Sequence, residues 1–402
     1  IMRRISLHTM FKVPDVTLHL GENNWVQHIV RSILITLLAW GLSHFVIYDL
    51  ESITTFASSE KKGDFHISDI YNAIANHRNV SQATPYVTVV AVDDCSRQDV
   101  MDVLDIISEY QPSVIGLDIF FRVPNNDSAQ IINLFKGTPN LVLPTILRKQ
   151  NNGDYERIVY SFVEQSLEAN YGYVNLNASS VVDVVRDFTP SQHIVNGDTM
   201  WQISAEMAQI AYPEKFNVLQ QRNNPTEIIQ FSSISIPIVS AQEILYGDDD
   251  AYLTRYLTNR AVLVGDVNNI NDMYSTPLNE LMPGITIHAH TLHTILSESY
   301  TSISPIWLNW LIALIICFLF LFINIKVRDK WSHVGNMIMR VLQITLMFSL
   351  VFIGSYWYSS HLQYIDFSPI ILMIGFSSLA SDIYDGLYAI YIKIIITKTQ
   401  KQ

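Results

Sequence analysis

Four apolar stretches divide the chain, and a long segment of mixed polarity separates the first from the second. The stretches are 28–48, 304–325, 340–359 and 367–390. Each of the middle two offers about 20 residues without interior charge, enough for a helix to cross a hydrocarbon core of roughly 30 Å. The pattern predicts four transmembrane helices, one before the mixed segment and three after it. No small-x-small cleavage site follows the first stretch, so we expect it to be retained as an anchor.

Lysine and arginine are distributed unevenly among the connections between these helices. Basic residues precede the first helix, lie between the second and third, and follow the fourth, whereas 360–366 contains neither lysine nor arginine. Basic connections remain on the cytoplasmic side of a membrane, which sets the orientation. The predicted order is 1–27 cytoplasmic, 28–48 helix, 49–303 outer domain, 304–325 helix, 326–339 cytoplasmic loop, 340–359 helix, 360–366 outer loop, 367–390 helix and 391–402 cytoplasmic tail.

Within the outer segment, short apolar runs alternate with stretches of helical spacing. The runs 86–92, 114–121 and 141–147 are typical of buried strands, and helical patterns at 100–107 and 129–135 connect them. This alternation predicts an α/β domain with a mainly parallel sheet and right-handed crossovers. Further helices are predicted at 68–74, 201–212 and 241–246, and further strands at 172–176, 182–186, 227–231 and 261–265, with 182–186 as a hairpin partner of 172–176.

Composition and charge narrow the class of protein. The chain is 49% hydrophobic with a mean hydropathy of +0.20, too apolar for an ordinary soluble protein. Its net charge of −12 falls mostly on the outer segment, where basic residues occur singly. This distribution excludes nucleic acid as an expected partner. Cys95 lies in the outer segment and Cys317 in a predicted helix, so we expect no disulfide within the outer domain.

Aspartates follow or interrupt three of the predicted strands. Asp93 and Asp94 end the first, Asp118 interrupts the second, and Asp266 follows the run 261–265. Ligands bind outside the carboxyl ends of strands in open parallel sheets, so these carboxylates are candidates for binding a cation or an amine. Helix capping and turn formation are the structural alternative. Asp272 lies in the following loop, where it either caps a helix or gates a ligand.

Three histidines, His288, His290 and His293, lie close enough in sequence to suggest zinc, but no glutamate is interleaved as in a zinc hydrolase helix. We expect them to serve packing and turns, and we expect no metal. No nucleotide-binding or hydrolase motif is present, so neither a cofactor nor an enzymatic activity is predicted. Asp382 and Asp385, near the end of the last predicted helix, have no like-placed partner in the other helices, which favours helix packing over an ion path.

Four ordered segments of this sequence resemble one known family. They are VTVVAVDDCS, PSVIGLDIFF, YGYVNLNASSVVDVVRDF and RAVLVGDVNNINDMYSTPLNELMPGITIHAHTLHTIL. Together, over roughly 85–296, they are similar to the type-two CHASE domain. The most specific pieces are Asp93, the strand with Asp118, the segment 183–186, and Pro283-Gly284 followed by 287–289.

The resemblance implies an extracytoplasmic sensory module of bacterial cyclases, kinases and diguanylate cyclases, with one span before the domain and three after it. Two features depart from the family. SRQDV replaces a Trp-Pro-x-Arg-like segment after the first strand, and no output domain follows the last span before Gln402. We therefore expect either a sensor that acts through a separate protein or a truncated chain.

The resulting hypothesis is a sensor subunit of the bacterial inner membrane, multi-pass, with its large domain in the periplasm. Its expected partners are membrane lipids, a separate membrane or cytoplasmic output protein, and a second copy or a larger membrane complex. Pro283, Gly284, His288 and Pro305 are the predicted coupling residues, because 261–296 runs almost directly into the second span. The alternatives are a scaffold subunit of a cell-envelope complex and, less well supported, a metal-dependent enzyme.

Overall fold

The computed structural model describes residues 24–49, 67–78, 82–138, 140–151, 153–178, 184–195, 197–231, 234–278 and 281–399. The chain divides into two units. The helical unit comprises 1–60, 304–354 and 365–402, and the α/β unit comprises 61–303 and 355–364.

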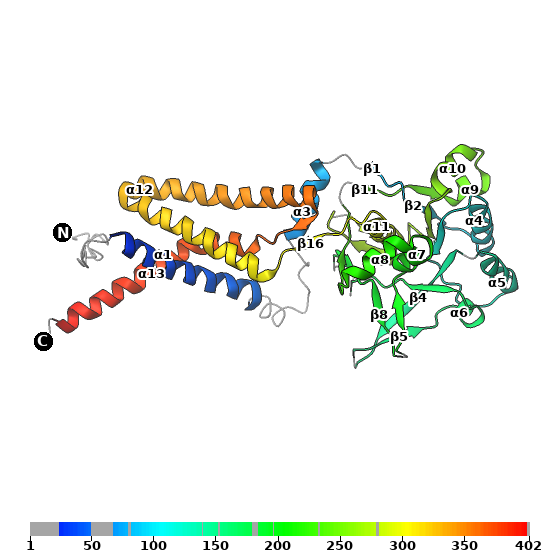
Figure 1. The fold of residues 1–402 in the computed structure, drawn as a ribbon, viewed down its shortest axis with the longest axis horizontal. Helices are drawn as coiled ribbons and strands as arrows, with labels where there is room; N and C mark the ends of the chain where they lie inside the picture. Colours follow the sequence, from blue (N-terminus) through cyan, green and yellow to red (C-terminus); the bar gives the residue numbers. More distant parts are fainter. Residues whose placement is uncertain are drawn as a thin grey trace, which may run out of the picture. The chain divides into compact units, whose positions relative to one another are not determined.

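The helical unit is built from α1 (Asn24–His44), which runs into the short π-helix η2 (Phe45–Asp49), most of α12 (Ile306–His361), and α13 (Ser368–Thr399). Figure 1 shows that α12 consists of two arms joined by a reversal. The reversal is tight enough that a Cβ on Gly335 would lie 2.7 Å from the carbonyl oxygen of Val327, eight residues earlier. Four stretches are long and apolar enough to cross a membrane: Trp25–Ile47, Ile306–Trp331, Val334–His361 and Ser368–Thr397.

Polar side chains within the helical unit join helices that are distant in sequence. Gln343 donates to the Ile374 carbonyl at 2.6 Å and accepts from Ser378 at 3.1 Å. Asp385 on α13 pairs with Arg31 on α1 at 2.6 Å and with Arg328 on α12 at 3.6 Å. Asp385 thus has cationic partners on two other helices, which agrees with the helix-packing role favoured from the sequence, although the partners themselves were not predicted.

A seven-stranded sheet forms the centre of the α/β unit. Six strands lie in the order β12-β2-β13-β3-β4-β5, and β6 also pairs with β4. Every pairing is parallel except that of β4 with β5. The bounds are β2 (Val87–Ala91), β3 (Val114–Leu117), β4 (Leu141–Lys149), β5 (Tyr155–Ile158), β6 (Asn170–Tyr173), β12 (Ile238–Ser240) and β13 (Ala261–Gly265).

Helices cover both faces of this sheet, which explains why its strands read as continuous apolar runs rather than alternating ones. Val87 and Val89 of β2 face one core and Val90 faces the other. The core with Val89 is closed by α7 (Ile203–Ala211), α8 (Pro213–Arg222) and α11 (Gly284–Leu296). The core with Val90 is closed by α4 (Arg97–Glu109), α5 (Ser128–Gly137), α6 (Phe162–Ser166), α9 (Ala241–Tyr246) and α10 (Asp250–Leu257).

Short strand pairs and one further helix complete the α/β unit. The helix is α3 (Ile67–Arg78), and a 3-10 turn, η3 (Ile270–Asp272), precedes β14. The pairs are β1 (Gln82–Ala83) with β11 (Ile234–Ser235), β7 (Asp187–Phe188) with β10 (Glu227–Ile228), β8 (Ser191–His193) with β9 (Thr199–Trp201), β14 (Met273–Ser275) with β15 (Leu281–Pro283), and β16 (Ser302–Ile303) with β17 (Gln363–Tyr364).

The predicted fold class, an α/β domain with a mainly parallel sheet and one plus three apolar helices, is confirmed. Two details are wrong. The strand predicted at 114–121 ends at Leu117, because its pairing with β13 ends there and only the Asp118 amide still donates to the Val264 carbonyl. The segment 182–186 is no hairpin partner of β6, which pairs with β4 instead; 182 and 183 lie outside the described residues, and Val184 forms a bridge with Ser275.

Candidate functional site

The predicted aspartates lie at one edge of the sheet because their strands are neighbours. In the order β2-β13-β3, Asp93, Asp266 and Asp118 each follow a strand's carboxyl end. The chain leaves β2 and β3 toward the helices of one face, and it leaves β13 toward α11 on the other. Such a topological switch point opens a crevice at the carboxyl ends of the strands, which is where α/β sheets bind ligands.

Asp93 and Asp266 form the centre of this edge. Asp93 accepts hydrogen bonds from the backbone amides of Val267 at 2.7 Å and Asn268 at 3.0 Å, and from the Asn268 side chain at 3.0 Å. Burial raises the pKa of Asp93, and its hydrogen bond with Asp266 raises it further. The same hydrogen bond lowers the pKa of Asp266. Asp93 therefore holds its proton to a higher pH than an isolated aspartate does.

Asp118 and Asp272 extend the edge toward α11. Burial, followed by the neighbouring charge of Asp272, raises the pKa of Asp118 to about 7. Burial also raises the pKa of Asp272. The hydrogen bonds that its carboxylate accepts from the Tyr274 hydroxyl and the Gly284 amide lower this pKa but do not cancel the effect of burial. A Cβ on Gly284 would lie 2.7 Å from a carboxylate oxygen of Asp272, so this position needs glycine. Asp272 thus binds the first turn of α11, as the capping alternative predicted.

Asp94 differs from the other candidates. Its side chain is exposed, and its backbone has a φ of 57°, the left-handed conformation that aspartate tolerates in turns. The structure gives it a turn role beside Asp93. Two residues of the edge, Asn268 and Tyr274, were not predicted from the sequence. Asn268 lies in the loop that begins at Asp266, and Tyr274 lies in β14 after it, so the length of that polar segment was the available signal.

The three histidines lie buried along α11 and have separate partners. His288 is bonded to Gln202 at 2.7 Å, His290 to the carbonyl oxygen of Gln230 at 3.2 Å, and His293 to Thr84 at 2.7 Å. Burial lowers the pKa of each imidazole to about 4. They are neutral packing residues at physiological pH. Across the described ranges, no group of three or more His, Cys, Asp or Glu residues is placed to hold a metal ion.

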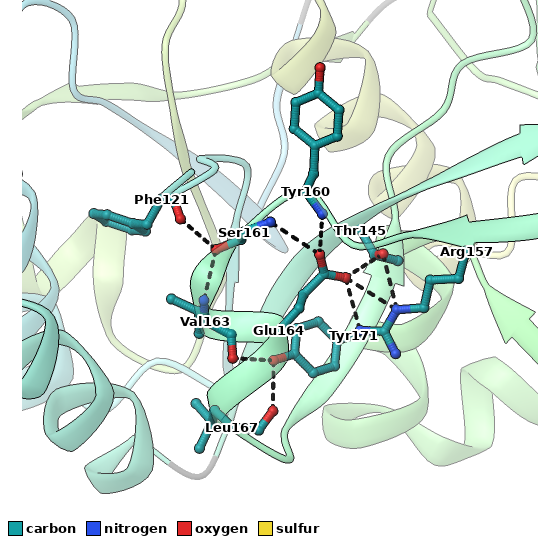
Figure 2. Close-up of polar contacts among 9 residues, drawn as sticks. All are labelled: Phe121, Thr145, Arg157, Tyr160, Ser161, Val163, Glu164, Leu167 and Tyr171. Atoms are coloured by element: carbon teal, nitrogen blue, oxygen red, sulfur yellow. Dashed lines mark hydrogen bonds and ion pairs between the residues drawn. The ribbon is translucent and has the colours of Figure 1, made fainter. Parts of the chain in front are cut away.

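A second polar cluster lies beside β4 and is centred on Glu164, whose side chain is 1% exposed (Figure 2). One carboxylate oxygen accepts from Thr145 at 2.6 Å and from Arg157 at 2.9 Å, and the other accepts from the Tyr160 amide at 2.9 Å. The adjoining cavity, about 10 Å³ in volume, has room for about one water molecule. Because the carboxylate is already satisfied, this cluster stabilises the fold and is not a ligand site.

The remaining predicted coupling residues lie at element boundaries. Pro283 is the last residue of β15 and directly precedes α11. Pro305 directly precedes α12, and its carbonyl accepts from the amides of Leu308 at 3.0 Å and Asn309 at 3.2 Å. The run from β13 to α12 therefore contains the acidic edge, the capped helix α11 and the entry to a candidate membrane span.

Comparison with known families agrees with this architecture. A family model described as the CHASE2 domain matches residues 57–325, which is more than half of the 402-residue chain. Searches among curated proteins and among solved structures gave no match. CHASE2 domains are extracytoplasmic sensory domains rather than catalytic ones. The chain therefore belongs to the CHASE2 family, and it joins the sensory domain to four helices that can cross a membrane.

Proposed function

We propose that this chain is a sensor subunit of the bacterial inner membrane, with the α/β unit in the periplasm and a separate protein as its output. A ligand or partner binds at the edge formed by Asp93, Asp118, Asp266 and Asp272. At neutral pH this edge is anionic, which suits a cation or an amine. The observation that carries the proposal is the position of these carboxylates at a switch point, where two of them, Asp266 and Asp272, belong to the chain segment that leads into α12.

The coupling route is supported by a junction inside the α/β unit. β16, which immediately precedes the second span, pairs in parallel with β17, which lies between the third and fourth spans. Tyr358 is 1% exposed there and bonds to Asn72 of α3 at 3.3 Å, and its ring lies 6.4 Å from that of Tyr71. A shift of α11 is therefore delivered to three spans together, rather than to the second span alone.

An ion pair holds α3 in this junction. Both oxygens of Asp69 accept from Arg186, at 2.8 and 2.7 Å, and both side chains are less than one-fifth exposed. A bidentate pair of this kind fixes orientation as well as distance. Arg186 follows Val184, which bridges Ser275 next to Tyr274 of the acidic edge. The edge and α3 are thus connected by a short run of ordered residues.

The scaffold alternative gains little from the structure. It rested partly on the small residues of the last two spans, which permit lateral packing between proteins. Ser377 donates to the carbonyl of Ile374 at 2.6 Å, and Ser378 donates to Gln343 at 3.1 Å. A Cβ on Gly375 would lie 3.6 Å from the Met347 side chain. These residues are used within the chain's own bundle.

Purification of the full chain from its native membranes in mild detergent tests the proposal. We expect an output protein to co-purify, in an amount that changes when both Asp93 and Asp266 are replaced by asparagine. Asp105→Asn, at an exposed position of α4, is the matched control and should leave the yield unchanged. A stoichiometric assembly that is indifferent to the double variant would support the scaffold instead. Replacing 299–304 with a flexible linker should abolish the response of the output protein, and a normal response would refute the coupling route.

A further inference from the structure

Two arginines and one aspartate meet near one end of the helical unit. Arg31 of α1 approaches one oxygen of Asp385 at 2.6 Å, and Arg328 of α12 approaches the other at 3.6 Å. All three residues lie within candidate membrane spans, and their side chains are 28%, 32% and 37% exposed. Two guanidinium groups facing one carboxylate leave a net charge of +1. An uncompensated charge at this position is costly in a membrane.

The arginines retain donors that Asp385 does not use. Nε of Arg31 donates to no atom of the described residues but is enclosed, so only the exposed part of the side chain, 28% of it, is open to a ligand. Arg328 donates to Ser381 at 3.3 Å from a second nitrogen. Guanidinium groups bind phosphate oxygens well because their donors form a planar fork. The same helix end carries Lys326 and Lys330 together with Asp329, so the positive charges still outnumber the negative ones there.

An apolar groove of about 420 Å³ lies between α1 and the first arm of α12, farther along both helices. Ile33 and Leu37 of α1 line it, two and six residues after Arg31, which places them about 3 and 9 Å farther along the helix axis. Ile315 and Phe318 of α12 form the opposite wall. The groove contains almost no polar surface to attract water, so an acyl chain is its natural occupant.

We propose that α1 and α12 form a binding site for one anionic phospholipid. Its phosphodiester monoanion lies against Arg31 and Arg328 and neutralises the cluster, while an acyl chain occupies the groove. By the distribution of lysine and arginine in the loops, this site is in the cytoplasmic leaflet. The proposal does not depend on what the α/β unit senses.

Native mass spectrometry of the full chain, with phosphatidylglycerol and phosphatidylcholine supplied in equal amounts, tests this site. We expect one phosphatidylglycerol retained per chain, with about a tenfold preference over phosphatidylcholine, because basic residues near the membrane surface attract lipids that carry a net negative charge. The double variant Arg31→Gln, Arg328→Gln should lose this preference. Lys393→Gln removes one charge at an exposed position of α13 and should keep it. Equal retention of both lipids by the unsubstituted chain would overturn the proposal.

Two further measurements distinguish a phospholipid in the groove from a free phosphate bound by the arginines alone. Ile315→Trp fills the groove without changing any charge, so it should lower phosphatidylglycerol retention even if the arginine variant folds poorly. An excess of inorganic phosphate should leave the lipid bound, because phosphate cannot occupy the groove. Displacement by phosphate, or full retention in the Ile315→Trp variant, would show that the groove plays no part and would refute the lipid site.

Discussion

Replacement of Asp118 by asparagine should stabilise the protein increasingly as the pH rises. The pKa of this carboxyl is raised from 3.8 to about 7, mainly by burial. A raised pKa means that the folded state holds the proton more tightly than the unfolded state. The favourable contribution of Asp118 to the free energy of unfolding is therefore fully present below about pH 4 and is lost as the pH rises to about 7. Asparagine has a similar shape and does not ionise, so it avoids this loss.

The size of the effect follows from the same shift. Each pKa unit corresponds to about 1.4 kcal/mol, so a rise from 3.8 to about 7 sets an upper limit of about 4 kcal/mol. Asp118 is only partly buried, and solvent screening reduces this limit. Between pH 4 and pH 8 we expect the variant to gain about 2 kcal/mol in unfolding free energy relative to the unsubstituted chain. This corresponds to a relative gain of about 4–8 °C in Tm for a domain of this size.

Thermal unfolding of the full chain in nanodiscs, followed by tryptophan fluorescence, measures this difference. The quantity of interest is the Tm of the variant minus that of the unsubstituted chain at each pH. This subtraction removes the contributions of other titrating groups, including Glu206, whose pKa burial also raises to about 7. Asp105→Asn, on the exposed side of α4, should show no trend with pH. A flat difference for Asp118→Asn, or one that falls with pH, would refute the assignment of a buried carboxyl at the sheet edge.

Three further changes test the packing, the junction and the buried histidines. Gly172→Ala places a Cβ 2.4 Å from the α7 backbone and should cost about 3 kcal/mol in unfolding free energy, whereas Gly137→Ala, with open space around it, should be nearly neutral. Tyr358→Phe removes a hydrogen bond to α3 worth about 1 kcal/mol, so the Ser302 amide should exchange about fivefold faster with deuterium; unchanged exchange would contradict the junction. Burial lowers the pKa of His293 to about 4, so its contribution to the free energy of unfolding is present above pH 6.5 and is lost as the pH falls. In His293→Gln, the fall in the free energy of unfolding at acid pH should therefore be less steep, by up to about 1.4 kcal/mol per pH unit.

The local pattern of the chain predicted the elements on which the site is built. Strand β13 and helix α9 have the predicted bounds, because apolar β-branched runs and a capping serine are local signals. The position of β13 between β2 and β3 was not predictable in this way, since it depends on a pairing more than 140 residues apart in sequence. The bond between Asp93 and Asp266 follows from that pairing. The sequence predicted that both aspartates lie at the same edge of the sheet, but not that they contact each other directly.

Local sequence patterns could not predict the pairing of very short strands or the ion pairs between separate helices. β16 and β17 have two residues each and pair across 60 positions, so neither has a periodic signal. The partners of Asp385 were overlooked for a related reason. Arg31 and Arg328 were considered only as markers of membrane orientation, and the antiparallel arrangement of α1 and α12 that brings them to one carboxylate appears only in three dimensions.

In the proposed sensor, the segment 261–303 would both receive and transmit the signal. Its strand supplies Asp266, its loop supplies Asp272, and the Asp272 carboxylate binds the first turn of α11. Neutralising that carboxylate, by a proton or by a bound cation, weakens its interaction with the positive end of the helix dipole. α11 is buried along its whole length, and close packing of this kind transmits strain, so in the proposed mechanism the helix shifts as a unit. The far end of α11 leads within six residues to β16, whose pairing with β17 carries the shift to the remaining spans.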